Sequence, residues 1–302
     1  MTSITLSFGE LLTFGLLTLA LAVPWFPLGK RDRRDGGWSR AGRPWVIALA
    51  AAIGSGLYFQ FLDWRGVLAI AALGVVSWGV YRREVPVGVC LLSVVGVVVL
   101  AAGLSIHVIP GFNNPKILSG VVLSPDAEPY SKYLNFDKAV IGLFLLAFGQ
   151  QLISRRHEWA EMLRRTAPVT AGTAGIVLVL SFALGYVRFE PALPPFLLFW
   201  SWTNLFFTCV AEEAIFRGFI QRGLERGLTG YRFGALTALL IASVLFGLAH
   251  WAGGPKYIFL ATVAGIGYGL AMRRSGHIEG SIATHFLLNF LHYTFFTYPA
   301  LA

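Results

Sequence analysis

Apolar segments that approach or reach the length of a membrane-spanning helix recur through most of this chain. A helix that crosses the hydrocarbon core needs about 20 predominantly apolar residues. Composition agrees with this length signal, because 56% of the residues are hydrophobic, only 13% are charged and the mean hydropathy is +0.67. We therefore expect an all-α fold, a polytopic transmembrane helical bundle of about 8–10 membrane helices. The ten segments are 11–28, 45–62, 66–81, 86–106, 139–154, 168–187, 196–216, 233–250, 257–272 and 281–298.

The basic residues predict how the bundle is oriented. The chain has 24 Lys and Arg against 15 Asp and Glu, and the basic residues cluster in alternate loops. Placing those loops inside collects 18 of the 24 and satisfies the positive-inside rule with both termini outside. We expect a multi-pass integral membrane protein, of the inner membrane in a bacterium, whose basic residues meet lipid and not nucleic acid. The inside loops are 30–43, 82–83, 155–165, 217–232 and 273–274.

Polar residues divide the chain into two parts. The string RFEPALPP, at 188–195, separates a first part with few polar groups in its apolar segments from a last part with many. We expect 1–190 to form N-terminal transmembrane helices and 191–302 to form a second transmembrane domain, which carries any chemistry. The one long polar connection, 107–138, is rich in turn formers and lies outside by the charge count. It is either a lid or docking surface, or an ordered cap without chemistry.

Two adjacent glutamates, Glu212 and Glu213, end the apolar run 196–211. A charged side chain at the bilayer centre costs at least ~2.5–3.5 kcal/mol on insertion scales, so such a residue is a functional-site hypothesis by default. Arg217 follows Glu213 by four residues and shares its helical face, where the two can pair. Glu212 points about 100° away on an ideal helix. We therefore expect Arg217 to support Glu213, and Glu212 to titrate or to activate a water.

Two further helices carry polar groups on apolar faces. His250 ends the next apolar run in the string FGLAH, and His285 and Asn289 share one face in SIATHFLLN. A lone histidine in such a helix is more often a satisfied core residue. Three helices that each carry such groups indicate one shared site instead, since unpaired polar groups are costly inside a membrane.

These residues permit two kinds of chemistry. A carboxylate and an imidazole around one water can act as a general base in hydrolysis, and an amide with a second imidazole can stabilise the oxyanion. Alternatively, Glu212, His250 and His285 match the His₂Glu ligand set of catalytic zinc. The chain has no HExxH string, which excludes a standard zincin on spacing.

The strings AEEAIFRGFI, FGLAH and GSIATHFLLN, in this order, resemble the EExxxR, FxxxH and HxxxN motifs of the CAAX-protease and bacteriocin-processing family (CPBP, or Abi) of intramembrane proteases. The intervening GIGYGLAMRRSG resembles the glycine-rich helix and basic turn of that family. The resemblance covers about residues 195–295. It implies a helical membrane core with an interior catalytic cavity, and hydrolysis of a peptide bond near the end of a membrane-anchored protein or peptide substrate.

The resemblance also implies roles for single residues. Glu212 resembles the water-activating glutamate and Glu213 the second, arginine-paired glutamate of the family motif. His250 resembles the partner that helps to hold the water, and His285 and Asn289 resemble the oxyanion-stabilising pair. The family is commonly labelled a metalloprotease, yet these roles favour a glutamate-type endopeptidase without a cofactor. Zinc held by Glu212, His250 and His285 is the alternative.

Glu212 and His250 can meet only if their helices place them at the same depth in the membrane. A straight helix would place Glu212 about 24 Å from the start of its apolar run, near the inner end, and His250 near the outer end of the next. The two could not then meet. We therefore expect the helix of Glu212 to run on past Arg217, the helix of His285 to begin near Gly276, and the site to lie at middle depth.

Two other functions remain open on sequence. An ion- or proton-coupled membrane transporter also uses intramembrane carboxylates and histidines, but it predicts inverted repeats and broken helices, and no internal repeat is visible. A family member that acts in bacteriocin immunity without catalysis is the second. The intact Glu212, His250, His285 and Asn289 count against that reading.

Overall fold

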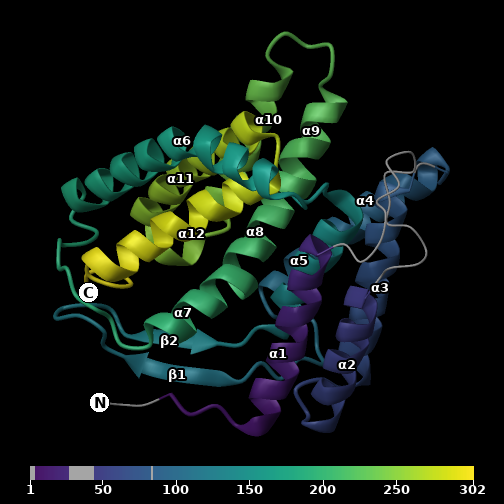
Figure 1. The fold of residues 1–302 in the computed structure, drawn as a ribbon, viewed down its shortest axis with the longest axis horizontal. Helices are drawn as coiled ribbons and strands as arrows, with labels where there is room; N and C mark the ends of the chain where they lie inside the picture. The colour runs from purple at the N-terminus through teal and green to yellow at the C-terminus, as the bar shows by residue number, and fades with distance from the viewer. Residues whose placement is uncertain (1–3, 27–43, 83) are drawn as a thin grey trace. The chain divides into compact units, whose positions relative to one another are not determined.

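The computed structural model describes residues 4–26, 44–82 and 84–302 (Figure 1). The predicted inside loop 30–43, and Arg83 of the loop 82–83, lie outside the described residues. The chain divides into two compact units. Unit 1 comprises 1–117, 133–154 and 206–211, and unit 2 comprises 118–132, 155–205 and 212–302.

Unit 1 is a group of helices around a buried α5. Side chains cap the N-termini of two of these helices. Ser7 and Glu10 form a capping box at α1, and the Asp63 side chain accepts hydrogen bonds from two backbone N–H groups at α3. Helix α4 exposes large apolar side chains along its length, as expected of a helix that faces lipid, whereas most of α5 is buried. The helices are α1 (Phe8–Ala22), α2 (Pro44–Tyr58), α3 (Trp64–Tyr81), α4 (Val87–Ser105) and α5 (Phe136–Gly149).

The segment 107–138, predicted as a long loop, is ordered. It forms a two-stranded sheet of β1 (Lys116–Val121) and β2 (Tyr130–Tyr133). The stretch between the strands is tied to the C-terminal residues, since Glu128 N–H donates to the Ala300 carbonyl at 2.9 Å and Ala302 N–H to the Asp126 carbonyl at 2.9 Å. The fold is mostly helical, as predicted, and this sheet is an element that the apolar pattern did not predict.

Residues 197–227 form one long helical segment of changing helix type, called the rod below. The rod runs without a break from α7 (Leu197–Asn204) through the π-helical η2 (Leu205–Cys209), the short α8 (Val210–Glu213) and the π-helical η3 (Ala214–Gln221) to α9 (Arg222–Gly227). Its part from Glu212 onward, with α7, belongs to unit 2. The expected continuation of this helix past Arg217 is therefore confirmed.

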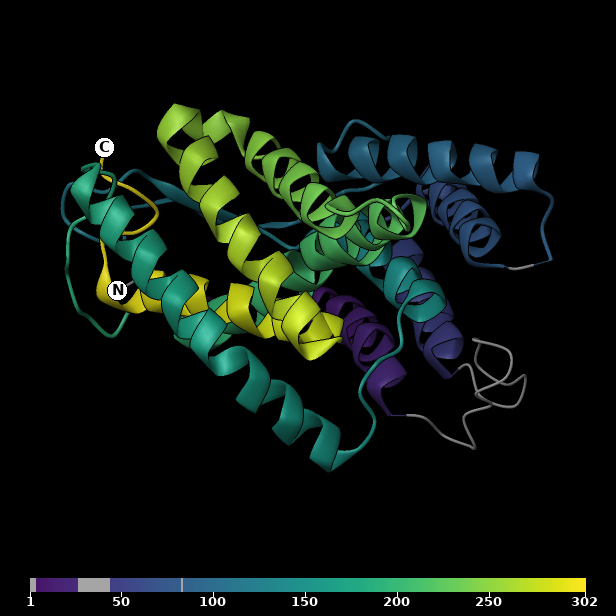
Figure 2. The same cartoon turned by 90° about the horizontal axis from the view of Figure 1, so that it is seen from above.

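Helices α10, α11 and α12 of unit 2 each contact η3. Helix α6 lies beside α11 and α12, where Thr170 and Thr284 share a hydrogen bond of 2.8 Å (Figure 2). A short 3-10 turn, Trp251–Gly253, joins α10 to α11. Helix α12 begins at Ile278, two residues after Gly276, as expected. The bounds are α6 (Arg156–Ala183), α10 (Gly234–Leu248), α11 (Gly254–Ser275) and α12 (Ile278–Phe295).

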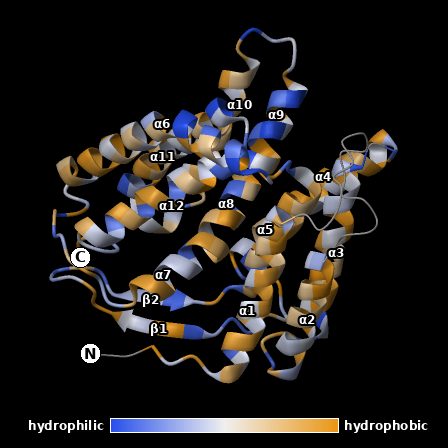
Figure 3. Ribbon diagram, viewed as in Figure 1, coloured by the Kyte–Doolittle hydropathy of each residue, from blue (hydrophilic) through white to orange (hydrophobic). Residues whose placement is uncertain are grey.

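Among the described residues, four helical segments are long and apolar enough to cross a membrane, and a bent pair, α10 with α11, makes up to five. The four are Phe8–Trp25, α3, α4 and α6. Several of the ten predicted segments are instead shorter helices, such as α2 with 15 residues, or lie in the rod with its π-helical turns. Apolar residues cover much of the ribbon (Figure 3). The chain is a multi-pass membrane protein, and its described residues contain fewer full-length spans than the apolar runs predicted.

Candidate functional site

The two glutamates lie in the four residues of α8, between two π-helical segments. π-helical turns are rare and occur frequently at functional sites. On an ideal α-helix Glu212 and Glu213 would point about 100° apart, yet here both approach one imidazole. Glu213 Oε1 is 2.8 Å from His285 Nδ1, and Glu212 Oε2 is 4.0 Å from His285 Nε2.

Glu213 and Arg217 form the predicted ion pair, and both side chains have no exposed surface. Arg217 Nη1 donates to Glu213 Oε1 at 3.3 Å, and Arg217 Nε is 3.3 Å from Glu213 Oε2. Arg217 Nη2 also donates to the Gly265 carbonyl at 2.9 Å. The guanidinium lies over the Phe246 ring at 4.4 Å and over the Tyr268 ring at 5.2 Å. Arg217 is thus held by a carboxylate, a carbonyl and two aromatic faces.

The glycine-rich helix α11 makes these contacts possible. A Cβ on Gly265 would lie 3.0 Å from Arg217 Nη2 and 3.2 Å from Ser243 Cα, and a Cβ on Gly269 would lie 2.6 Å from Gln221 Oε1. Small residues let helix backbones approach closely in membrane proteins. Glycine at these two positions therefore brings the polar face of η3 to the backbone of α11.

His285 is buried between the two glutamates and an aromatic wall. Its ring stacks on Tyr268 with centroids 4.4 Å apart, and it meets the edge of Phe246 at 5.7 Å. Because Glu213 is ion-paired with Arg217, it accepts the hydrogen bond and Nδ1 of His285 donates it. The other nitrogen, Nε2, is then the atom that faces Glu212. Sequence spacing predicted the Glu213–Arg217 pair but not that His285 shares the same carboxylate.

His250 lies at the break between α10 and α11, directly before the 3-10 turn. Its Nδ1 is 2.7 Å from the Phe246 carbonyl. A carbonyl only accepts, so Nδ1 carries the hydrogen and a neutral ring keeps its lone pair on Nε2. That Nε2 is 3.9 Å from Glu212 Oε2. The helix break thus turns the acceptor nitrogen of His250 toward the glutamate.

One oxygen, Glu212 Oε2, therefore faces the Nε2 atoms of both His250 and His285, at 3.9 and 4.0 Å. Two groups that each bond one water at about 2.8 Å stand roughly 4–5 Å apart. Ligands bound tetrahedrally at about 2.0–2.2 Å from zinc stand roughly 3.4 Å apart. The observed separations match a shared water better than a shared zinc ion.

Zinc would require the distances from Glu212 Oε2 to the two Nε2 atoms to shorten by about half an ångström. In the part of the chain that the structure describes, no group of three or more His, Cys, Asp or Glu side chains has a spacing that could hold a metal ion. The residues as placed do not fit the His₂Glu set that the sequence allowed.

Asn289 lies one turn beyond His285 on α12, and its side chain finds a partner that sequence reasoning missed. Asn289 Nδ2 is 3.4 Å from Oδ1 of Asn204, the last residue of α7, which is 5% exposed. An asparagine inside an apolar run, eight residues before Glu212, was the available signal. The predicted Glu212, Glu213, Arg217, His250 and His285 come together directly. Asn289 lies one turn from His285 on the same helix and contacts Asn204.

Residues 194–291 match the family described as type II CAAX prenyl endopeptidase Rce1-like. The matched range begins within the RFEPALPP boundary and contains all six residues of the predicted site. A search of curated proteins and a search of solved structures found no match to the chain. The family resemblance predicted from the three motifs is confirmed over this last third of the chain.

Proposed function

We propose, from the Rce1-like type II CAAX prenyl endopeptidase domain over residues 194–291, that this multi-pass membrane protein is an intramembrane endopeptidase. Its substrate would be a membrane-anchored protein or peptide, cleaved by a water that Glu212 activates. The observation that carries the proposal is the convergence of His250 Nε2 and His285 Nε2 on Glu212 Oε2 at 3.9 and 4.0 Å.

In the proposed reaction Glu212 takes a proton from the water while the water oxygen bonds to the carbonyl carbon of the scissile peptide. His250, with its Nδ1–H donated to the Phe246 carbonyl, accepts from the same water through Nε2. The carbonyl π electrons move to oxygen and form a tetrahedral oxyanion. When this intermediate collapses, the C–N bond breaks and the amine leaves with the proton held by Glu212. The products are a carboxylic acid and an amine.

The oxyanion needs hydrogen-bond donors, and the proposal assigns them to Asn289 and His285. Asn204 accepts from Asn289 Nδ2 and thereby fixes which way the amide faces. His285 donates from Nε2 only when its ring carries both protons, because Nδ1 already donates to Glu213. Glu213 then acts as a positioning residue, because it orients the His285 ring without touching the reacting atoms.

The deciding experiment uses the purified full chain in detergent, assayed on a membrane peptide library with and without a metal chelator. Glu212→Gln is the test variant, and Glu161→Gln, an exposed glutamate on α6, is the matched control. We expect activity to survive chelation and Glu161→Gln but to fall at least ~10²-fold in Glu212→Gln. Loss on chelation that added zinc restores would select the metal mechanism. Undiminished cleavage in both Glu212→Gln and His250→Ala would overturn the assignment, and ion-coupled uptake into vesicles would then test the transporter alternative.

A further inference from the structure

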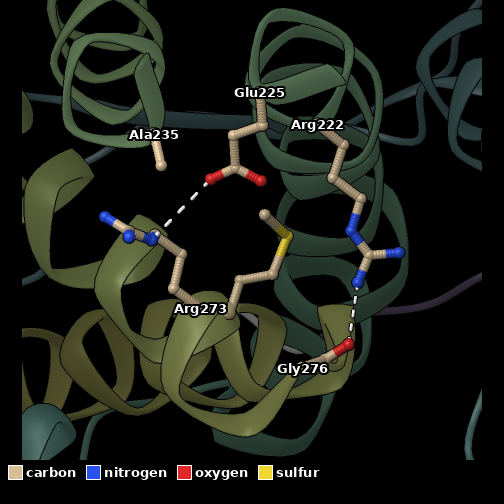
Figure 4. A pocket seen from close by; sticks show the side chains of 6 residues that line it. Arg222, Glu225, Ala235, Arg273 and Gly276 are labelled. Carbon is tan, nitrogen blue, oxygen red and sulfur yellow. Dashed lines mark hydrogen bonds and ion pairs between the residues drawn. The ribbon is translucent and has the colours of Figure 1, made fainter. Parts of the chain in front are cut away.

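A pocket away from the proposed active site lies in unit 2 between α9, the start of α10 and the end of α11. Its volume is about 360 Å³. Figure 4 shows the side chains of Arg222 and Arg273 on either side of the pocket, with Glu225 between them. The lining residues are Arg222, Glu225, Ala235, Met272, Arg273 and Gly276, and none of them belongs to the proposed catalytic set.

The two arginines are held in place by the protein. Arg222 Nη2 donates to the Gly276 carbonyl at 2.9 Å, at the C-terminal end of α11. Arg273 Nε lies 3.8 Å from Glu225 Oε1, and Gln221 Nε2 donates to the same oxygen at 3.2 Å. A guanidinium presents several donors in a planar fork that matches a phosphate group. The pocket therefore offers two oriented phosphate-binding groups.

Charge around the pocket is strongly one-sided. The segments 222–233 and 273–276 contain five arginines and a single acidic residue, Glu225. Hydrophilic residues accordingly gather on α9 in Figure 3. The local excess of positive charge selects an anion.

The surroundings favour a lipid as the source of that anion. Tyr231 and Phe233, in the turn before α10, are 73% and 61% exposed, and such aromatic residues are typical of the membrane–water interface. Ala235 and Met272 add an apolar wall inside the pocket. The pocket also lies at the end of the apolar bent pair α10 and α11. A ligand with a charged phosphate and an apolar body can contact both the arginines and the apolar wall, whereas a free phosphate can contact only the arginines.

We propose that this pocket binds the phosphate of an anionic phospholipid, with Arg222 and Arg273 as its ligands. Basic pockets at the ends of membrane helices are suited to lipid head groups. Glu225 orients Arg273 and at the same time repels an anion, so it sets the affinity below what two arginines alone would give. The proposal does not depend on the proposed proteolysis.

The test measures lipid binding to the purified full chain in detergent, by native mass spectrometry and by the thermal shift of the protein. The probes are phosphatidylglycerol, phosphatidylcholine and inorganic phosphate. We expect phosphatidylglycerol to bind, and Arg222→Gln and Arg273→Gln each to weaken it about tenfold, the worth of one charge-assisted hydrogen bond. Arg274→Gln is the matched control, since it removes the same charge one residue away from the lining, and we expect less than a twofold effect. Glu225→Gln should tighten binding severalfold.

Each other outcome overturns the proposal in a defined way. Equal weakening by Arg273→Gln and Arg274→Gln would mean diffuse surface charge and no built pocket. Equal binding of phosphatidylcholine would mean that the anion is not recognised. Competition by inorganic phosphate at the same concentration as the lipid would identify a soluble phosphate as the ligand. Because binding is measured without any substrate, loss of proteolysis and loss of lipid binding remain separate results.

Discussion

His285 Nδ1 lies 2.8 Å from Glu213 Oε1, and that carboxylate has no exposed surface. The same carboxylate is ion-paired with Arg217, so one buried anion holds a guanidinium and an imidazole at once. A charge buried in this way must be paired to be tolerated. The arrangement therefore supports the fold and at the same time fixes the ring whose Nε2 faces Glu212.

We predict that Arg217→Met strongly destabilises the protein, because it leaves Glu213 buried without its cation. The expected cost is about 3–5 kcal/mol, the usual range when one partner of a buried pair is removed. The thermal unfolding midpoint in detergent is the measurement. The double variant Glu213→Gln with Arg217→Met should regain part of that stability but not the peptidase activity, since His285 loses its anionic partner. A midpoint unchanged in Arg217→Met would contradict this role.

The exposed ion pair between Arg188 and Asp126 provides the contrast. Its atoms are 2.6 Å apart, but the two side chains are 54% and 74% exposed. Surface pairs contribute about 0–1 kcal/mol. We expect Asp126→Asn to shift the unfolding midpoint little and to leave peptide cleavage unchanged.

Gly265→Ala should disturb the site by displacing Arg217. The new Cβ would lie 3.0 Å from Arg217 Nη2 and 3.2 Å from Ser243 Cα, and overpacking of this kind costs about 1–3 kcal/mol. We expect a lower unfolding midpoint and a lower kcat. Gly175→Ala on α6 is the control, because its Cβ would meet nothing within 4 Å and should be neutral or stabilising. Equal behaviour of the two variants would show that close contact with α11 is not what holds Arg217.

Asn204 should act on catalysis through Asn289. We expect Asn289→Ala to lower kcat by about 10²–10³, the usual effect of losing one oxyanion donor. Asn204→Ala should lower kcat about fivefold with little change in KM, the worth of one neutral hydrogen bond. Thr203→Val is the control and should keep full kcat, because the buried Thr203 hydroxyl donates to the Phe199 and Trp200 carbonyls of its own helix. If Asn204→Ala lost as much activity as Asn289→Ala, Asn204 would itself contact the substrate.

His250→Ala should abolish peptide cleavage, and added imidazole should restore part of it. The variant removes the imidazole that shares the water with Glu212, and general-base assistance is typically worth about 10²–10⁴ in rate. Added imidazole should restore part of the turnover, while it should not restore Glu212→Gln. Cleavage at the original rate in His250→Ala would remove this histidine from the mechanism.

Some of this protein could be predicted from the chain alone. Apolar length predicted a multi-pass helical protein, since lipid imposes that constraint on any sequence. The i, i+4 spacing predicted the Glu213–Arg217 pair, because a single helix fixes the distance between such residues. The motif strings predicted the family over the last third, and the continuation of the rod past Arg217 followed from the need for Glu212 to meet His250.

The remaining features of the site were decided by the tertiary structure, because they depend on contacts between residues far apart in the chain. Glu213 shares its carboxylate with His285, 72 residues later, and Asn289 meets Asn204 across 85 residues. The π-helical segments on either side of α8 bring both glutamates to one imidazole, which no α-helical periodicity predicts. Spacing along one helix is set by local geometry. The 3.9 and 4.0 Å separations around Glu212 are set only when three separate helical segments pack together.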